Sequence, residues 1–238
     1  MMAVSHSRLR HHGWAIAVAG AAVACPMIAA GPLAAQNPDA GQMAEQYAQG
    51  AKANAQLMHQ YTWQMRVSLS YKGEDQDPML YQMNWDASGN LQKTLISAPP
   101  EQKKRHGIRK HVAESEISDF KKWMSGLMDL VKQYMTPSPG QMMDFYSKAT
   151  ITPSPSGGAA AMESGFIQAG DKVTFYMDPT TKQPTKFTFE TAYTGDPVSG
   201  TVTYAQVAGG PKYASQTTVS VPAKQVITTI ENFNFVKQ

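Results

Sequence analysis

The residue types that carry most enzyme chemistry are scarce in this sequence and stand apart from one another. Beyond its first 35 residues the chain has no cysteine and only the histidines His59, His106 and His111. There is no His-Glu-x-x-His pair, no Gly-x-Ser-x-Gly elbow and no phosphate-binding glycine loop. Its acidic residues are scattered, and local structure explains the groups in a turn at 73–78 and at a helix start near 114–119. We therefore predict a protein that is not an enzyme, with no catalytic residue, metal site or cofactor.

What the sequence has in excess is methionine and aromatic side chains at regular spacing. Apolar and polar residues alternate in 63–71 and 79–85, as in strands with one apolar face. Apolar residues recur at intervals of three and four in 117–135, as on one face of a helix. Methionine is flexible and suits surfaces that accept apolar partners of varying shape. The predicted ligand-binding set is Trp63, Met65, Tyr81, Met83, Trp85, Met124, Leu127 and Met128.

The alternative interpretation of these side chains is that they fill an ordinary core between helix and sheet. The pattern by itself favours that simpler interpretation. A sheet large enough to curl can nevertheless serve both purposes, because a helix covers part of it and leaves the rest as a pocket.

The N-terminus has the order of a secretory signal. Arg8 and Arg10 precede an uncharged apolar stretch at 14–24, and small residues at 31–35 precede a polar segment. The apolar stretch is shorter than the roughly 20 residues that span a bilayer. We predict a signal peptide over 1–35, cleaved after Ala35, and a soluble periplasmic or secreted protein. Cys25 follows a degenerate lipoprotein box, so lipid anchoring at Cys25 is the less favoured alternative.

The remaining 203 of 238 residues suffice for one domain, predicted over 36–238. With Arg8 and Arg10 removed, 19 basic residues face 18 acidic ones, so the charge balance gives no reason to expect a nucleic-acid partner. Basic charge gathers in one predicted loop, between the third strand and the long helix. Its predicted role is contact with an anionic headgroup, although a solvated loop is the commoner explanation; the residues are Lys103, Lys104, Arg105 and Arg109.

The order of elements predicts an α+β fold. A helix at 43–60 precedes strands at 63–71, 79–85 and 91–96, and helices at 117–135 and 141–149 follow. A flexible linker is expected at about 152–162. Turns rich in Gly, Pro and Asp then separate strands at 166–168, 173–177, 185–193, 198–206, 215–221 and 225–236. We expect one curved antiparallel sheet with an N-terminal helix and two helices inserted between two runs of strands.

This order of elements resembles the half-barrel of periplasmic lipoprotein carriers of the LolA type. The stretch 175–184, with Asp178-Pro179-Thr180-Thr181 at its turn, is similar to a strand–turn–strand element of that superfamily. The resemblance covers most of 40–238 and implies a LolA-like half-barrel that holds an apolar ligand.

A second resemblance is to a family of uncharacterised bacterial exported proteins. The shared features are Gln60-Tyr61-Thr62-Trp63, a basic segment at 103–109, a Gly-Pro-x-Tyr turn at 210–213 and a final strand at 230–235. His106 interrupts the basic segment, and the family brings no known activity.

Three hypotheses from different classes follow, of which the third, a hydrolase, has no supporting group of residues in the sequence. The first is a non-enzymatic carrier for a lipid or another apolar ligand in the cell envelope. The second is an envelope sensor or structural protein that acts through a protein partner, with strand edges and the region 136–161 making the contacts.

Overall fold

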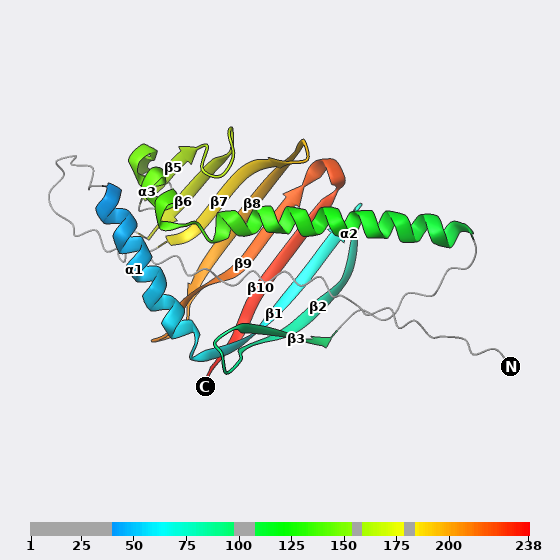
Figure 1. Ribbon diagram of the computed structural model, residues 1–238, viewed down its shortest axis with the longest axis horizontal. Coiled ribbons are helices and arrows are strands. Elements are labelled where there is room, and N and C mark those ends of the chain that lie inside the picture. Colours follow the sequence, from blue (N-terminus) through cyan, green and yellow to red (C-terminus); the bar gives the residue numbers. More distant parts are fainter. Residues whose placement is uncertain (1–39, 98–107, 154–158, 179–183) are drawn as a thin grey trace.

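The computed structural model of the protein describes residues 40–97, 108–153, 159–178 and 184–238 (Figure 1). Within these residues the helices are α1 (Ala40–Met58), α2 (Ile108–Met135) and α3 (Pro139–Lys148). The strands are β1 (Tyr61–Tyr71), β2 (Glu74–Trp85), β3 (Leu91–Ser97), β4 (Thr150–Pro153), β5 (Ala159–Ser164), β6 (Lys172–Met177), β7 (Pro184–Tyr193), β8 (Asp196–Gln206), β9 (Lys212–Val221) and β10 (Val226–Lys237). A short 3-10 turn, η1 (Pro222–Lys224), connects β9 to β10.

All ten strands form one antiparallel sheet in the order β3-β2-β1-β10-β9-β8-β7-β6-β5-β4. The first run of strands joins the second because β10 pairs with both β1 and β9. The sheet curves around α2, which lies across its concave face (Figure 1). The expected α+β fold, with a curved antiparallel sheet and two helices inserted between two runs of strands, is confirmed.

The two faces of the sheet differ because side chains alternate along each strand. The concave face is apolar, with Val67 of β1, Val202 of β8 and Ile230 of β10 all buried. The convex face carries a row of hydroxyl side chains paired directly across neighbouring strands: Thr174, Thr188, Thr201, Thr218, Thr229 and Ser68. An antiparallel sheet of this kind buries one face and exposes the other to water.

Helix α1 docks where β9 begins. Tyr47 and Met58 are its buried apolar contacts. The Asn54 side chain pairs with the backbone of Lys212, as a residue of a neighbouring strand would. Its Nδ2 donates to the Lys212 carbonyl at 3.0 Å, and its Oδ1 accepts from the Lys212 amide at 2.8 Å. This pair satisfies a buried amide side chain and fixes α1 against the sheet.

Three expectations about local structure are wrong. Helix α2 begins at Ile108, so 108–111 belong to the helix and not to a basic loop. The region 152–162 includes residues of β4 and β5, which pair with each other. The expected strand at 166–168 is a turn, and Asp171 accepts hydrogen bonds from the amides of all three residues.

Candidate functional site

The concave face of the sheet and one face of α2 enclose a continuous apolar layer. From the sheet, Met65 and Val67 of β1 and Tyr81 and Met83 of β2 are buried in it. Met65 and Met83 have no exposed surface at all. They share one face because Met65 pairs directly with Tyr81, and Trp63 with Met83, across the β1–β2 ladder.

Helix α2 supplies the opposite side of the layer. Met124, Leu127, Met128, Val131 and Met135 are spaced by three and four residues, and all are buried. The charged residues between them, such as Lys132, are exposed. Gly126 allows a close approach at this surface, because a Cβ there would lie 2.0 Å from the Tyr193 hydroxyl.

The structure brings the eight predicted ligand-binding residues together around this layer. Seven are buried in one core cluster, and the eighth, Trp85, is partly buried at its margin. Trp85 Nε1 donates to the Met58 carbonyl at 2.9 Å, and its ring stacks on His59 with 4.0 Å between centroids. That these residues bind a ligand stays a prediction.

The predicted headgroup contacts are placed only in part. Lys103, Lys104 and Arg105 lie outside the described residues, and Arg109 lies in the first turn of α2.

The C-terminal half of α2 is tied to the sheet by a buried polar network. Tyr134 donates its hydroxyl proton to Asp171, with 2.8 Å between Oη and Oδ2, and Oη also lies 2.8 Å from Thr191 Oγ1. The Tyr134 ring stacks on Phe189 with 4.6 Å between centroids. Burial raises the pKa of the Tyr134 hydroxyl, so the group stays a neutral donor at physiological pH.

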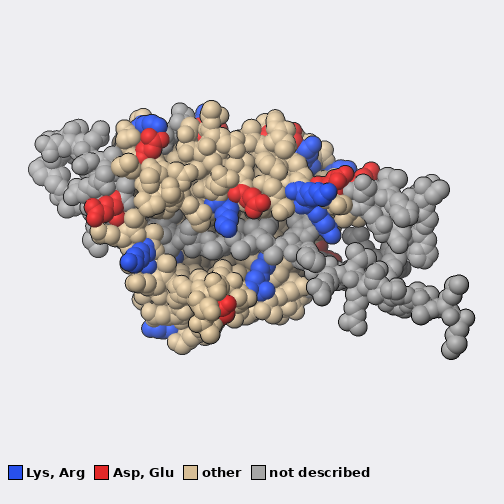
Figure 2. Space-filling model, in the orientation of Figure 1, with Lys and Arg blue, Asp and Glu red and all other residues tan. Residues whose placement is uncertain are grey.

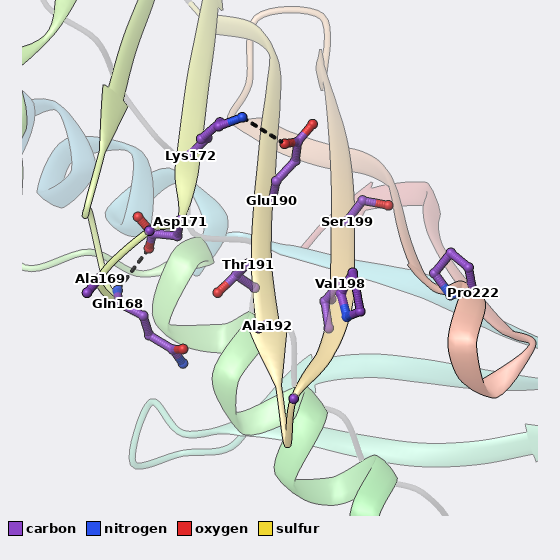
Figure 3. Close-up of a pocket in the computed structure, with 13 residues that line it drawn as sticks. Gln168, Ala169, Asp171, Lys172, Glu190, Thr191, Ala192, Val198, Ser199 and Pro222 are labelled. Atoms are coloured by element: carbon purple, nitrogen blue, oxygen red, sulfur yellow. Dashed lines mark hydrogen bonds and ion pairs between the residues drawn. The ribbon is translucent and has the colours of Figure 1, made fainter.

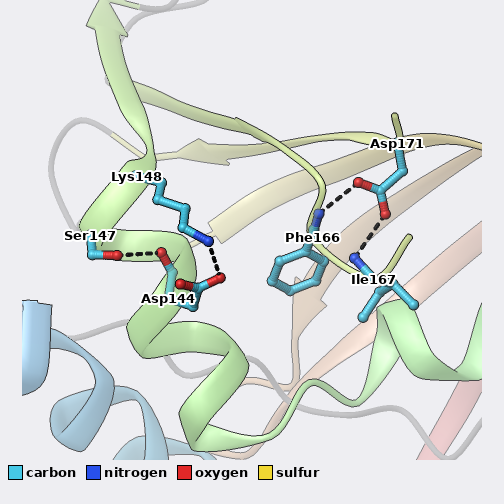
Figure 4. A network of polar contacts seen from close by, with 6 residues as sticks. All are labelled: Asp144, Ser147, Lys148, Phe166, Ile167 and Asp171. Atoms are coloured by element: carbon cyan, nitrogen blue, oxygen red, sulfur yellow. Dashed lines mark hydrogen bonds and ion pairs between the residues drawn. The ribbon is translucent and has the colours of Figure 1, made fainter. Parts of the chain in front are cut away.

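Asp171 is the centre of this network. Its carboxylate accepts hydrogen bonds from the amides of Phe166 and Ile167 at 2.6 and 2.8 Å (Figure 4). It also accepts one from the amide of Gln168 at 2.9 Å. Burial alone raises the pKa of this carboxyl, but the hydrogen bonds outweigh burial and hold the pKa below its ordinary value. With its lone pairs occupied in this way, Asp171 organises a turn and is not available as a general base.

The N-terminal half of α2 rests on the sheet through a different type of contact. Phe120 packs on Tyr71 with 4.6 Å between ring centroids, and Trp123 packs on Tyr193 at 5.9 Å. All four side chains are only partly buried. Trp123 Nε1 also donates to Thr194 Oγ1 at 3.2 Å. We call these four residues the aromatic clasp.

A recess of about 410 Å³, lined by both polar and apolar side chains, lies outside the apolar layer, between the β5–β6 turn and the β7–β8 hairpin (Figure 3). Lys172 and Glu190 form an exposed ion pair at its margin, with 3.8 Å between Nζ and Oε2. Asp171 also borders the recess, but its carboxylate is turned toward the backbone it holds. The recess therefore offers one exposed charge pair and the hydroxyls of Thr191 and Ser199, with no histidine or cysteine among its lining residues.

Several polar side chains on the concave face were not among the predicted site residues, and Thr228 and Lys93 are two of them. Thr228 of β10 is 2 % exposed, and within the described residues its Oγ1 is buried without a hydrogen-bond partner. Lys93 of β3 pairs directly with Met83 and is partly buried. A sequence signal existed for Lys93, because it alternates in phase with Leu91 and Leu95 in an apolar series.

Charges of both signs are scattered over the surface shown in Figure 2, without a broad area of one sign. Among the residues that the structure describes, no three His, Cys, Asp or Glu side chains are grouped as metal ligands. No described helix has the length and apolar composition needed to cross a bilayer.

Comparisons with known proteins gave structural matches only. No family model matches the chain, and no curated protein matches it. A LolA superfamily protein of Nitrosomonas europaea is similar over 79 % of this chain and 93 % of its own, with 10 % identity and a TM-score of 0.34. A DUF1329 family protein of Desulfovibrio piger is similar over 79 % and 92 %, with 9 % identity and a TM-score of 0.33. A domain assigned to outer membrane lipoprotein sorting in Vibrio parahaemolyticus is similar over 80 % and 90 %, with 11 % identity and a TM-score of 0.39.

Proposed function

We propose that this protein is a non-enzymatic carrier of the bacterial periplasm that binds a lipid or another apolar ligand between its sheet and α2. The signal-like N-terminus supports the location. The observation that carries the proposal is that methionines from both sides of the apolar layer belong to one buried cluster, Met65 and Met83 from the sheet and Met124 and Met128 from α2. Methionine side chains have three rotatable bonds and can repack around a guest of variable shape.

The attachments of α2 support a helix that can be displaced. Its described hydrogen bonds to the sheet side come from Tyr134, near its C-terminal end, and from Trp123 in the aromatic clasp. Between these two points the contacts are apolar side chains, for which an acyl chain is a chemical substitute. Leu127 and Val131 have no exposed surface, so a ligand can contact them only if neighbouring groups move.

Thr228 adds a second support. A buried hydroxyl without a partner costs about 1–3 kcal/mol relative to a satisfied one. Thr228 lies among apolar residues on the concave face, paired with Leu69 of β1 and Val219 of β9. A bound ligand that carries a hydroxyl, ester or carboxyl oxygen would remove this penalty.

The direct test is native mass spectrometry of the protein purified without detergent from a bacterial envelope extract. We expect mass additions that correspond to lipids, and saturable uptake of a fluorescent fatty acid by the delipidated protein. A clean protein mass together with no fatty-acid uptake contradicts the proposal. A stoichiometric protein partner recovered with ligand-free protein would favour the envelope sensor or structural role instead.

A variant pair links the binding to the methionines. Met65→Leu combined with Met83→Leu keeps the volume nearly constant and costs less than about 1.5 kcal/mol per site. We expect this variant to fold and to bind a narrower range of acyl chain lengths. Met143→Leu on α3 is the control, because Met143 is 49 % exposed and lies outside the layer. An unchanged ligand range in the double variant contradicts the role given to the methionines.

A further inference from the structure

Thr228 places a hydroxyl group inside the apolar layer. It lies near the start of β10, on the concave face, between Val226 and Ile230, which are both buried. On the two neighbouring strands it pairs directly with Leu69 of β1 and Val219 of β9. The direct neighbours of Thr228 on this face are therefore all apolar.

The Thr228 hydroxyl is buried and unsatisfied. Within the described residues Oγ1 has no hydrogen-bond partner, and the residue is only 2 % exposed, so bulk water does not replace that partner. A buried water molecule is held by roughly two to four polar groups, and the direct neighbours of Thr228 provide none. A plain hydrocarbon chain would leave the hydroxyl as it is. The partner that fits this position is an oxygen atom carried into the layer by a ligand.

The ligand oxygen that meets Thr228 must be uncharged. A threonine hydroxyl compensates no charge, and burying an ionised carboxylate or phosphate among apolar side chains costs far more free energy than burying a hydroxyl. A second hydroxyl group suits the position, because each hydroxyl can donate to or accept from the other. The charged end of an amphiphilic ligand must then lie where water reaches it.

The nearest margin of the apolar layer is the aromatic clasp. Leu69, beside Thr228, and Tyr71 of the clasp are only partly buried. Tyr71 pairs with Val226, which places it diagonal to Thr228, at about 7–8 Å. Lys72 is an exposed cation at the same margin, with Nζ 5.0 Å from the centroid of the Tyr71 ring. A ligand whose charged end emerges here brings the first carbons of its chain, and not its far end, to Thr228.

We infer that Thr228 is a specificity-determining residue, and that the preferred ligand is an acyl chain with a hydroxyl group near its charged end, as in a 3-hydroxy fatty acid. The inference rests on the proposed function and assigns its ligand class. The ligand hydroxyl and the Thr228 hydroxyl form one hydrogen bond inside the layer, and the rest of the chain contacts apolar side chains.

The experiment compares three acids of equal chain length: hexadecanoic acid, 3-hydroxyhexadecanoic acid and 16-hydroxyhexadecanoic acid. The two hydroxylated acids have the same composition and differ only in the position of the hydroxyl. Affinities are measured by displacement of a fluorescent fatty acid from the unaltered protein, from Thr228→Val and from Thr228→Ser. The control is Thr229→Val, because Thr229 follows on the same strand but belongs to the hydroxyl row of the convex face.

We expect the unaltered protein to bind the 3-hydroxy acid about threefold to tenfold more tightly than either other acid, as one net hydrogen bond allows. Thr228→Val should reduce this preference to less than about twofold and retain binding of hexadecanoic acid, because valine keeps the shape of threonine without its hydroxyl. Thr228→Ser and Thr229→Val should keep the preference. If the unaltered protein binds the acids without preferring the 3-hydroxy acid, or if Thr228→Val keeps the preference, the inference is overturned and the proposed function stands. If the unaltered protein binds none of the three acids, the proposed function fails as well.

A second measurement uses the ligand-free protein. Replacing a buried, unsatisfied hydroxyl by a methyl group of the same shape removes the cost of its desolvation. Ligand-free Thr228→Val should therefore have a higher midpoint of urea denaturation than the unaltered protein. Thr229→Val should raise the midpoint less, because Thr229 is only partly buried. A midpoint that does not rise in Thr228→Val would show that the hydroxyl is already satisfied in the free protein, and would overturn the inference.

Discussion

Asp171 shows how one buried carboxylate can decide local structure. The sequence around it predicted a strand at 166–168, yet three successive amides there turn toward its carboxylate. The same carboxylate accepts a hydrogen bond from Tyr134, so one side chain shapes the β5–β6 turn and holds α2. Hydrogen bonds to charged groups contribute about 1.5–3 kcal/mol each, more than the local strand preference of a few residues.

Replacing this carboxylate should destabilise the protein. We expect Asp171→Asn to lower the free energy of unfolding at pH 7 by roughly 2–3 kcal/mol, because the uncharged amide is a weaker acceptor for four donors. The measurement is chemical denaturation followed by circular dichroism. The control is Asp144→Asn, which removes only an exposed ion pair with Lys148 and should change stability by less than about 1 kcal/mol.

The same variant carries a pH signature. The folded protein holds the pKa of Asp171 below its ordinary value of 3.8. The stability that this shift contributes is therefore complete above pH 3.8 and is lost as pH falls through the folded-state value. The stability difference between the two proteins should shrink as pH falls below 3.8. A difference that stays constant down to pH 2 would show that folding does not lower the pKa of Asp171.

At single positions, residues that belong to a repeating apolar pattern could be predicted from the sequence, and isolated polar residues within that pattern could not. Alternation placed Trp63, Met65 and Met83 on one face, and all three are buried together. Lys93 alternates with apolar residues in the same way, but it was not predicted, because the face was identified by its apolar residues and a charged side chain is not expected there. Its environment became visible only from the register of β2 and β3.

Among the elements, long periodic segments were predicted well and boundaries less well. Helix α2 extends nine residues before Ile117, through 108–116, where no apolar repeat marked it. Strand β5 begins with three alanines, which have low strand propensity, and it forms because β4 and β6 offer hydrogen-bond partners on both sides. The start of α2 and the pairing of β4 with β5 depend on contacts with other parts of the fold, which a single sequence does not show.

A glycine lets β7 and β8 pack closely on the concave face. Gly200 pairs directly with Phe189, whose ring covers the glycine. A Cβ at Gly200 would lie 2.1 Å from ring atoms of Phe189, which is 1 % exposed and cannot swing into water. The missing side chain is thus part of the packing between these strands.

Gly200→Ala should therefore lower the free energy of unfolding by about 1–3 kcal/mol, as overpacking in a core does. Chemical denaturation measures the change. Gly140→Ala in α3 is the control, because the nearest atom to its added Cβ is Ser138 Oγ at 4.0 Å. Alanine in a helix is also favoured over glycine, so this control should be neutral or slightly stabilising. Equal effects at both positions contradict the packing explanation.

For the whole molecule, one strand holds the sheet together. Strands β1 to β3 precede α2, strands β4 to β9 follow α3, and β10 pairs with a member of each group. Order in the sheet thus differs from order in the chain. Alternation predicted a single sheet, but the central place of β10 is a matter of pairing between distant segments and became clear only from the structure.

This topology predicts a gradient of hydrogen exchange. We expect the slowest amides in β1, β10, β9 and β8, which are paired on both sides, and the fastest strand amides in the edge strands β3 and β4. Exchange followed by mass spectrometry after peptide digestion measures this order. Slower exchange in β3 or β4 than in β10 would show that the pairing in solution differs.

The central position of β10 also affects the order in which the sheet can form during synthesis of the chain. During synthesis, strands β1 to β3 leave the ribosome long before β10. In the folded protein β10 pairs with β1, and Tyr61 lies opposite Lys237, far away in the sequence. Contacts between such distant segments form slowly, because a long loop must close before they are gained. Until β10 is synthesised, β1 lacks one of its two neighbours, so the native sheet cannot be completed from the first run of strands alone.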